Sequence, residues 1–170
     1  FEINFSQNYT QYYHNIYDPS GSDTLDASSL YSGIFVSSRN NYDTERLEVF
    51  YNPHVGLDVS ENFLSITGQT ETIIGTNYAD FFEAKSFNFD IEGMDGDDTL
   101  YLHQIDSLLF DGGSGIDEII FDNFNLNEIS EVNLNNDTLE ILFNEQYSVS
   151  LKNVEYLTLG RDTSPIDIIS

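Results

Sequence analysis

The chain has 170 residues, with 30 acidic and five basic side chains and a formal charge of −25 at neutral pH. Such a charge repels nucleic-acid phosphates and anionic lipid surfaces, which excludes both as partners. The absence of cysteine excludes disulfides, zinc–thiolate centres and thiol catalysis, and no apolar run approaches the length of a membrane helix. The 13 Phe and 11 Tyr nevertheless distinguish the chain from an acidic disordered tail. We therefore expect one folded domain, residues 1–170, whose charge is offset by cations.

Residues 1–56 form the expected N-terminal flank, in which apolar and polar side chains alternate over short runs as in β-strands. The flank is rich in tyrosine, whose ring can stack on a sugar while its hydroxyl forms hydrogen bonds. The same side chains would equally serve to cover the end of a coiled structure. The candidate sugar-stacking residues are Tyr9, Tyr12, Tyr13 and Tyr42.

Residues 18–26 read DPSGSDTLD, with an aspartate in sixth place and an apolar residue in eighth place when Asp18 is counted first. Carboxylates within a glycine-containing turn are suitable ligands for a hard cation. Asp18 and Asp23 are therefore candidate ligands of an additional metal site.

Residues 75–120 contain three copies of one pattern, with Gly first, Asp sixth and an apolar residue eighth: GTNYADFF, GMDGDDTL and GGSGIDEI. Asp98 follows Asp80 by twice the length of a nonapeptide, and the interval from Asp98 to Asp117 is one residue longer. Glycine permits tight turns with positive φ, and the eighth residue lies in a short strand and points into the core. The spacing predicts an all-β fold, a right-handed parallel β-roll or β-solenoid, with three turns stacked along one side.

Residues 57–74 have the same spacing without the carboxylates. Counting back two nonapeptide lengths from Gly75 reaches Leu57, which places Asn62 sixth and Leu64 eighth. The spacing predicts that residues 57–74 form the first turn of the coil, which begins before its metal ligands do. The expected coil spans residues 57–120.

Calcium takes six to eight oxygen ligands, more than one such turn can offer. Two stacked turns, each with an aspartate and about two carbonyl groups, can supply them, which predicts two pockets between the three turns. With the additional site this gives about two or three Ca²⁺ ions. The predicted carboxylate ligands are Asp80, Asp98 and Asp117, and the predicted carbonyl ligands are those of Gly75, Asn77, Gly93, Asp95, Gly96, Gly112, Ser114 and Gly115.

Residues 121–170 depart from the repeat. Asn135-Asn136-Asp137 separates two apolar runs, which is typical of a β-hairpin. Two further strand patterns cover residues 147–151 and 154–159. Because the end of a solenoid has to be covered, we expect this segment to form an antiparallel cap.

These motifs resemble known calcium-binding repeats. Residues 112–119 match the nonapeptide repeat of RTX, or haemolysin-type, proteins at every fixed position. Residues 16–36, IYDPSGSDTLDASSLYSGIFV, and residues 71–76, ETIIGT, are similar to segments of the C-terminal calcium domain of serralysin-type bacterial metalloproteases. One departure is Ser20, which stands where that family usually has Gly.

The resemblance implies a non-catalytic calcium-binding domain, a fragment of a larger bacterial protein secreted by a one-step secretion system. It would fold on binding calcium and support the secretion and stability of a covalently linked catalytic or adhesive domain. We expect no enzyme activity, because the three histidines do not form H-E-x-x-H and no G-x-S-x-G is present. The alternative is a calcium-dependent carbohydrate-binding module of an adhesin or a polysaccharide-active enzyme, with a glycan as partner.

Overall fold

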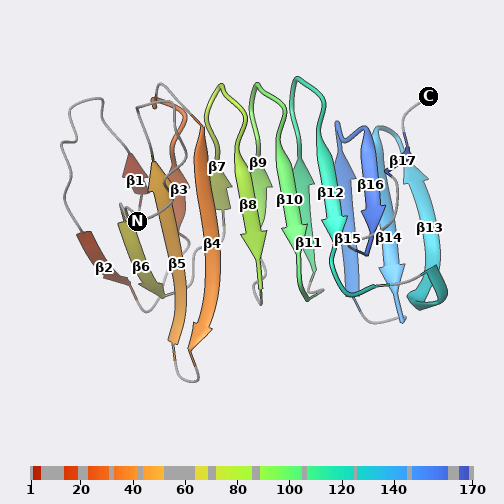
Figure 1. Cartoon of the computed structure of the whole chain (residues 1–170), viewed down its shortest axis with the longest axis horizontal. Helices are drawn as coiled ribbons and strands as arrows, with labels where there is room; N and C mark the ends of the chain where they lie inside the picture. The colour runs from red at the N-terminus through yellow and green to blue at the C-terminus, as the bar shows by residue number, and fades with distance from the viewer. Residues whose placement is uncertain are drawn as a thin grey trace.

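The structure, a computed structural model, describes residues 2–4, 14–18, 23–30, 33–41, 44–51, 64–68, 72–85, 89–104, 107–124, 126–144, 147–160 and 165–168. Within these ranges, only the backbone is described for 2–4, 14–18, 38–41, 44–51 and 64–68. The described residues form an all-β fold of two sheets that is rich in parallel pairs, with one 3-10 helix, η1 (Leu126–Glu128) (Figure 1). This confirms the expected all-β fold class. No helix in the described ranges is long and apolar enough to span a membrane.

Eight of the described strands make up the first sheet. Their order is β1 (Glu2–Asn4), β3 (Thr24–Asp26), β7 (Thr72–Ile74), β9 (Asp90–Glu92), β11 (Leu108–Asp111), β15 (Tyr147–Lys152), β14 (Thr138–Phe143) and β13 (Ile129–Asn135). The pairs from β1 to β15 are parallel, and the last three strands pair antiparallel.

The second sheet contains nine of the described strands. Their order is β17 (Ile166–Asp167), β16 (Tyr156–Leu159), β12 (Glu118–Phe121), β10 (Thr99–Leu102), β8 (Phe81–Ala84), β4 (Ile34–Asn41), β5 (Thr44–Tyr51), β6 (Leu64–Gly68) and β2 (His14–Asp18). From β16 to β4 the neighbours are parallel.

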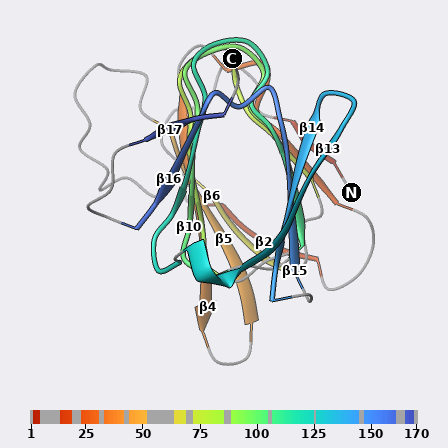
Figure 2. The same cartoon turned by 90° about the vertical axis from the view of Figure 1, so that its right-hand side faces the viewer.

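Between β7 and β12 the chain alternates regularly between the two sheets. β7, β9 and β11 lie side by side in the first sheet, and β8, β10 and β12 lie side by side in the second. Viewed along the row of strands, successive passages of the chain superpose, with the turns that lead from the first sheet to the second gathered at one edge (Figure 2). This alternation brings residues that are one passage apart in the sequence next to each other.

The core lies between the sheets and is built from the inward-facing residue of every second position. The eighth residues of the three copies, Phe82, Leu100 and Ile119, are paired in register across the second sheet and are all buried. Ile91 and Phe110 are paired in the first sheet and are also buried. Burying such a side chain contributes about 1.5–3 kcal/mol, so this alternation supplies the main apolar driving force.

One register prediction is wrong. Leu64 begins strand β6, but β4 and not β6 lies beside β8, with Phe35 opposite Phe81. The two rings stack with centroids 5.3 Å apart. The strands β4, β5 and β6 are joined antiparallel, so this insertion separates β6 from the repeat. Counting back from Gly75 fails because it assumes an uninterrupted coil.

The C-terminal cap is smaller than expected. β13 and β14 form the predicted hairpin, with Asn136 at a φ of 54° in its turn, and β14 pairs antiparallel with β15. However, β15 pairs parallel with β11 and β16 pairs parallel with β12. The parallel stacking therefore does not stop at Ile120 but includes one further passage of the chain, up to Leu159.

Candidate metal centre

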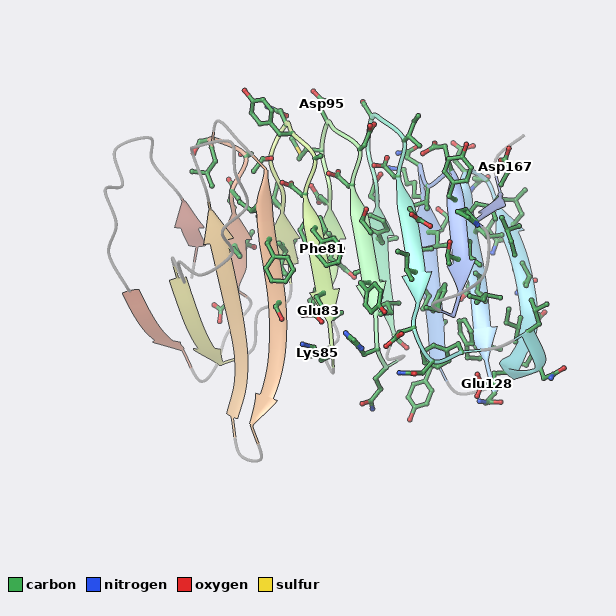
Figure 3. The ribbon with its side chains drawn as sticks, viewed as in Figure 1. Phe81, Glu83, Lys85, Asp95, Glu128 and Asp167 are labelled. Atoms are coloured by element: carbon green, nitrogen blue, oxygen red, sulfur yellow. The ribbon has the colours of Figure 1, made fainter. Side chains whose placement is uncertain are left out.

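The three glycine-rich turns, residues 75–80, 93–98 and 112–117, lie side by side at one edge of the two sheets. Each follows a strand of the first sheet and leads into a strand of the second. The last two turns are joined by backbone hydrogen bonds, from the Gly96 N–H to the Ser114 carbonyl and from the Ser114 N–H to the Met94 carbonyl, both 2.8 Å. Asp95 lies at the outer edge of its turn (Figure 3). The predicted stacking of the turns is confirmed.

The sixth-place aspartates form a ladder through the stacked turns. Asp80, Asp98 and Asp117 are all buried. The backbone N–H of Asp80 donates to Oδ1 of Asp98, and the N–H of Asp98 donates to Oδ1 of Asp117, both at 2.8 Å. Each carboxylate is thereby fixed against the preceding turn. The regular spacing of the aspartates in the sequence places these three side chains together as predicted.

The second carboxylate oxygens differ along the ladder. Oδ2 of Asp80 accepts the Thr76 N–H at 2.6 Å, while its Oδ1 accepts the Thr76 hydroxyl at 2.9 Å and the Ile34 N–H at 2.7 Å. Oδ2 of Asp98 and Oδ2 of Asp117 are buried and accept no hydrogen bond from the described residues. Unsatisfied buried carboxylate oxygens are costly, so these two call for a positive partner.

Carbonyl groups lie close to the same carboxylates because glycine has no Cβ atom to keep them away. A Cβ atom on Gly75 would meet both Oδ2 of Asp80 and the Gly93 carbonyl, the latter at 2.7 Å. A Cβ atom on Gly93 would meet Oδ2 of Asp98 and, at 2.5 Å, the Gly112 carbonyl. Each Gly therefore lets a carboxylate and the first carbonyl of the next turn approach its backbone closely, where a side chain would collide with both.

The ladder has a fourth member that the repeat did not predict. The N–H of Asp117 donates to Oε2 of Glu155 at 2.7 Å, and the Asn153 carbonyl faces Gly112 as the Gly112 carbonyl faces Gly93. The turn of residues 153–155 has no glycine and is shorter than the repeats, so the nonapeptide pattern cannot detect it. The signal that could have found it is the apolar alternation after it, since Leu157 takes the inward place beside Ile119.

Burial raises the pKa of all three aspartates. It raises the pKa of Asp98 to about 8, with added repulsion from Asp80 and Asp117, and a backbone hydrogen bond opposes the shift. It raises the pKa values of Asp80 and Asp117 to about 6, again against hydrogen bonds that favour the ionised form. An ionised ladder is therefore unfavourable without a cation beside it.

The donor set fits a hard cation. Carboxylate and carbonyl oxygens are the ligands that calcium prefers, and no thiolate is available. The described residues contain no group of three or more His, Asp or Glu side chains placed to hold a metal ion. An ion at the ladder would therefore take one or two carboxylates, with carbonyl oxygens and water completing its shell. The carbonyls of Gly93 and Gly112 are the best placed of those predicted.

The remaining candidate ligands have different positions. Of the predicted carbonyl donors, Ser114 already accepts the Gly96 N–H, and Gly75, Asn77, Asp95 and Gly115 belong to the same three turns. Asp18 ends β2 and Asp23 precedes β3, so they lie at the opposite edge of the sheets from the ladder. The candidate sugar-stacking residues Tyr9, Tyr12, Tyr13 and Tyr42 lie outside the described residues.

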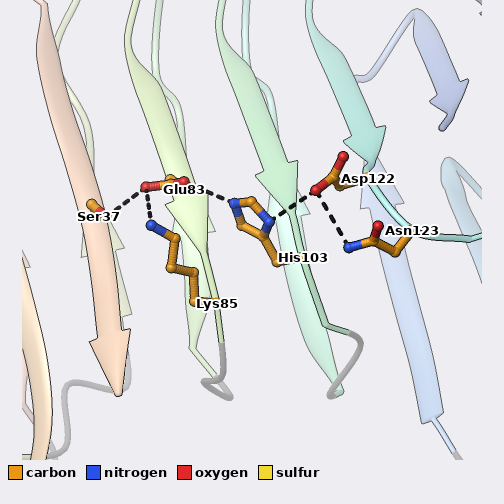
Figure 4. A network of polar contacts seen from close by, with 6 residues as sticks. All are labelled: Ser37, Glu83, Lys85, His103, Asp122 and Asn123. Atoms are coloured by element: carbon orange, nitrogen blue, oxygen red, sulfur yellow. Dashed lines mark hydrogen bonds and ion pairs between the residues drawn. The ribbon is translucent and has the colours of Figure 1, made fainter. Parts of the chain in front are cut away.

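A second polar cluster lies on the outer face of the second sheet (Figure 4). His103 Nε2 is 2.8 Å from Glu83 Oε1, and His103 Nδ1 is 3.1 Å from Asp122 Oδ2. Burial works to raise the pKa of Glu83, but hydrogen bonds from Ser37, Lys85 and His103 outweigh it and lower the pKa. Both ring nitrogens of His103 thus face a carboxylate oxygen. The cluster ties three neighbouring passages of the chain together.

No protein-family model matches this chain, and no curated protein is similar to it in sequence.

Proposed function

We propose that this chain is a calcium-binding module of a secreted bacterial protein, a right-handed parallel β-roll whose stacked turns fold around Ca²⁺. The observation that carries the proposal is the Asp98 carboxylate, which is 1 % exposed and whose Oδ2, near the Gly112 carbonyl, accepts no hydrogen bond from the described residues. A buried carboxylate of this kind is expected to be either protonated or paired with a cation. The oxygen-only surroundings favour calcium among cations.

The regular alternation of the chain supports a β-roll. Two short strands and two turns make up each passage, and in-register parallel neighbours recur from each passage to the next. In such a structure each passage contacts only its neighbours, so every turn contributes to two interfaces. An ion bound between two turns would therefore stabilise the interface between two neighbouring passages of the chain.

The net charge of −25 explains why folding would depend on calcium. Without the ion, ionised carboxylates repel one another and oppose compaction. With the ion, each pair of turns gains an attractive bridge, and binding to the folded state alone stabilises it by about 2.7 kcal/mol per ion at a hundredfold excess over Kd. Such a module would stay unfolded at low cytosolic calcium and fold at extracellular calcium concentrations.

The role in the parent protein follows from this behaviour. A chain that remains unfolded until it leaves the cell suits export through a one-step secretion channel. Once folded, it would stabilise a catalytic or adhesive domain linked to it, and it needs no catalytic residues of its own. The resemblance of residues 16–36 and 112–119 to serralysin-type and RTX calcium domains supports this assignment.

Circular dichroism of the full chain, first in EGTA and then during a calcium titration, tests the proposal. We expect little β-structure in EGTA and a cooperative gain of β-structure as calcium is added, with magnesium at the same concentration as the control ion. Calcium is expected to act far more strongly, because Mg²⁺ demands a rigid octahedron and releases its water reluctantly. A β-spectrum that neither EGTA nor calcium changes would refute calcium-dependent folding.

A further inference from the structure

The turn of residues 153–155 continues the stack beyond the glycine-rich repeats. The N–H of Gly112 donates to the Lys152 carbonyl at 2.9 Å, as the N–H of Gly93 donates to the Asp111 carbonyl at 2.8 Å. On the other side of the turn, the N–H groups of Glu155 and Tyr156 both donate to the Asp117 carbonyl at 3.0 Å. Residues 153–155 therefore stand in the same relation to the third repeat as that repeat does to the second.

Glu155 takes the place of a sixth-place aspartate in this turn. The N–H of Asp117 donates to Oε2 of Glu155, as the N–H of Asp98 donates to Oδ1 of Asp117. The turn is shorter than the glycine-rich turns, and the glutamate side chain is one methylene longer than aspartate. The longer side chain compensates for the shorter turn and brings a carboxylate to the same step of the ladder.

Asp117 provides an independent indication that a ligand belongs at this step. Its side chain is fully buried, and its Oδ2 accepts no hydrogen bond from the described residues. The Asn153 carbonyl approaches Gly112 closely: its oxygen would collide with a Cβ atom there, and Cβ and Cγ of Asp117 lie 2.6 Å from where that Cβ atom would stand. The carboxylates of Asp117 and Glu155 and the Asn153 carbonyl thus lie at the same step of the stack.

We propose that Asp117, Glu155 and the Asn153 carbonyl form a cation pocket between the third repeat and the C-terminal part of the chain. The inference rests on the proposed function, since the ion would be the same divalent cation that the repeats take. Compared with the two pockets predicted between the three repeats, the ion-binding positions then lie one turn further toward the C-terminus. At Asp80, three hydrogen bonds from Thr76 and Ile34 satisfy both carboxylate oxygens, whereas Oδ2 of Asp98 and Oδ2 of Asp117 accept no hydrogen bond from the described residues.

The position of this pocket gives it a distinct consequence. Glu155 lies far along the chain from Asp117, and the intervening segment contains the β13–β14 hairpin and β15. An ion held by both carboxylates would fasten β16 and the cap to the end of the repeats. Calcium would then close the C-terminal end of the structure as well as order its middle.

Calcium titration of the full chain by isothermal calorimetry tests the pocket, with wild type, Glu155→Gln and Glu140→Gln compared. Gln at 155 keeps an oxygen for the Asp117 N–H but removes the charge, while Glu140→Gln removes the same charge from β14, away from the ladder. We expect Glu155→Gln to bind one ion fewer than wild type, or to bind one ion at least roughly tenfold more weakly, and Glu140→Gln to match wild type. Hydrogen exchange of residues 156–159 should lose its calcium-dependent protection in Glu155→Gln alone.

Asp98→Asn in the same titration separates this inference from the proposed function. Loss of an ion in Asp98→Asn with unchanged binding in Glu155→Gln would overturn the pocket and leave calcium binding by the repeats intact. Unchanged binding in both variants would overturn both. If Glu155→Gln does not fold in calcium, Glu155→Asp retains the charge on a shorter side chain. It is expected to show the same loss of one ion, and wild-type binding by that variant would overturn the pocket.

Discussion

Replacing Asp98 by Asn should change stability in opposite directions with and without calcium. In the calcium-free fold, burial raises the pKa of Asp98 to about 8, so at pH 7 the folded chain has to take up a proton that the unfolded chain lacks. Neutral pH lies roughly 3 pH units above the ordinary pKa of 3.8, so protonating this carboxylate on folding costs about 4 kcal/mol at most. Asn avoids this cost and still offers an oxygen to the Asp80 N–H.

We therefore expect Asp98→Asn to stabilise the calcium-free protein by about 2–4 kcal/mol. At saturating calcium the same variant should be less stable than wild type, because a neutral amide is a weaker calcium ligand than a carboxylate. Asp95→Asn is the matched control, since it removes one charge from an exposed side chain of the same turn. Its effect should stay within about 0.5 kcal/mol.

Urea unfolding followed by circular dichroism measures both effects, in EGTA and in excess calcium. An osmolyte such as TMAO brings the calcium-free chain into the folded range where needed. The expected result is a change of sign between the two conditions for Asp98→Asn alone. Destabilisation in EGTA as large as that in calcium would show, against this expectation, that the carboxylate stabilises the fold without an ion.

Three further outcomes are expected. The folded chain raises the pKa values of all three ladder aspartates, so in EGTA their protonated forms stabilise the fold, an effect that is complete below about pH 4 and is lost as the pH rises through 6 to 8. Circular dichroism in EGTA should therefore show more β-structure at pH 5 than at pH 8. The opposite order would contradict the burial of these groups. Gly113→Ala should lower the free energy of unfolding by at least about 1–3 kcal/mol, because φ is +94° and a Cβ atom would collide with the Met94 carbonyl. Ser114→Ala in the same turn should be nearly neutral. Equal urea midpoints for the two variants would argue against this turn geometry. His103→Leu should lower the free energy of unfolding by about 1–3 kcal/mol, because it leaves two carboxylates without the side chain that they share. A melting temperature of His103→Leu no lower than that of Gln104→Ala would show that the cluster adds no stability.

The parts of the structure that sequence predicted are those set by short-range regularity. The nearly constant spacing of the aspartates places them on one ladder, and the alternation after each turn buries Phe82, Leu100 and Ile119. Both follow from strand geometry, in which successive side chains alternate between the two faces, and from the regular length of each passage of the chain.

The parts that sequence did not predict depend on contacts between distant segments. Nothing in residues 33–36 marks them as neighbours of β8, because the antiparallel β5 and β6 interrupt the spacing. Thr76 has no place in a metal-binding pattern, yet its N–H and hydroxyl satisfy Asp80. Glu155 lacks the glycines of the repeat and is recognisable only once β16 is seen beside β12.

Anomalous X-ray scattering from crystals grown with calcium would show whether calcium occupies the aspartate ladder. We expect an anomalous peak within about 2.4 Å of Oδ2 of Asp98, with a second peak between Asp117 and Glu155. A ladder without any anomalous peak, in crystals whose turns stack as described, would contradict the account, because the buried carboxylates would then be held by protons and hydrogen bonds alone.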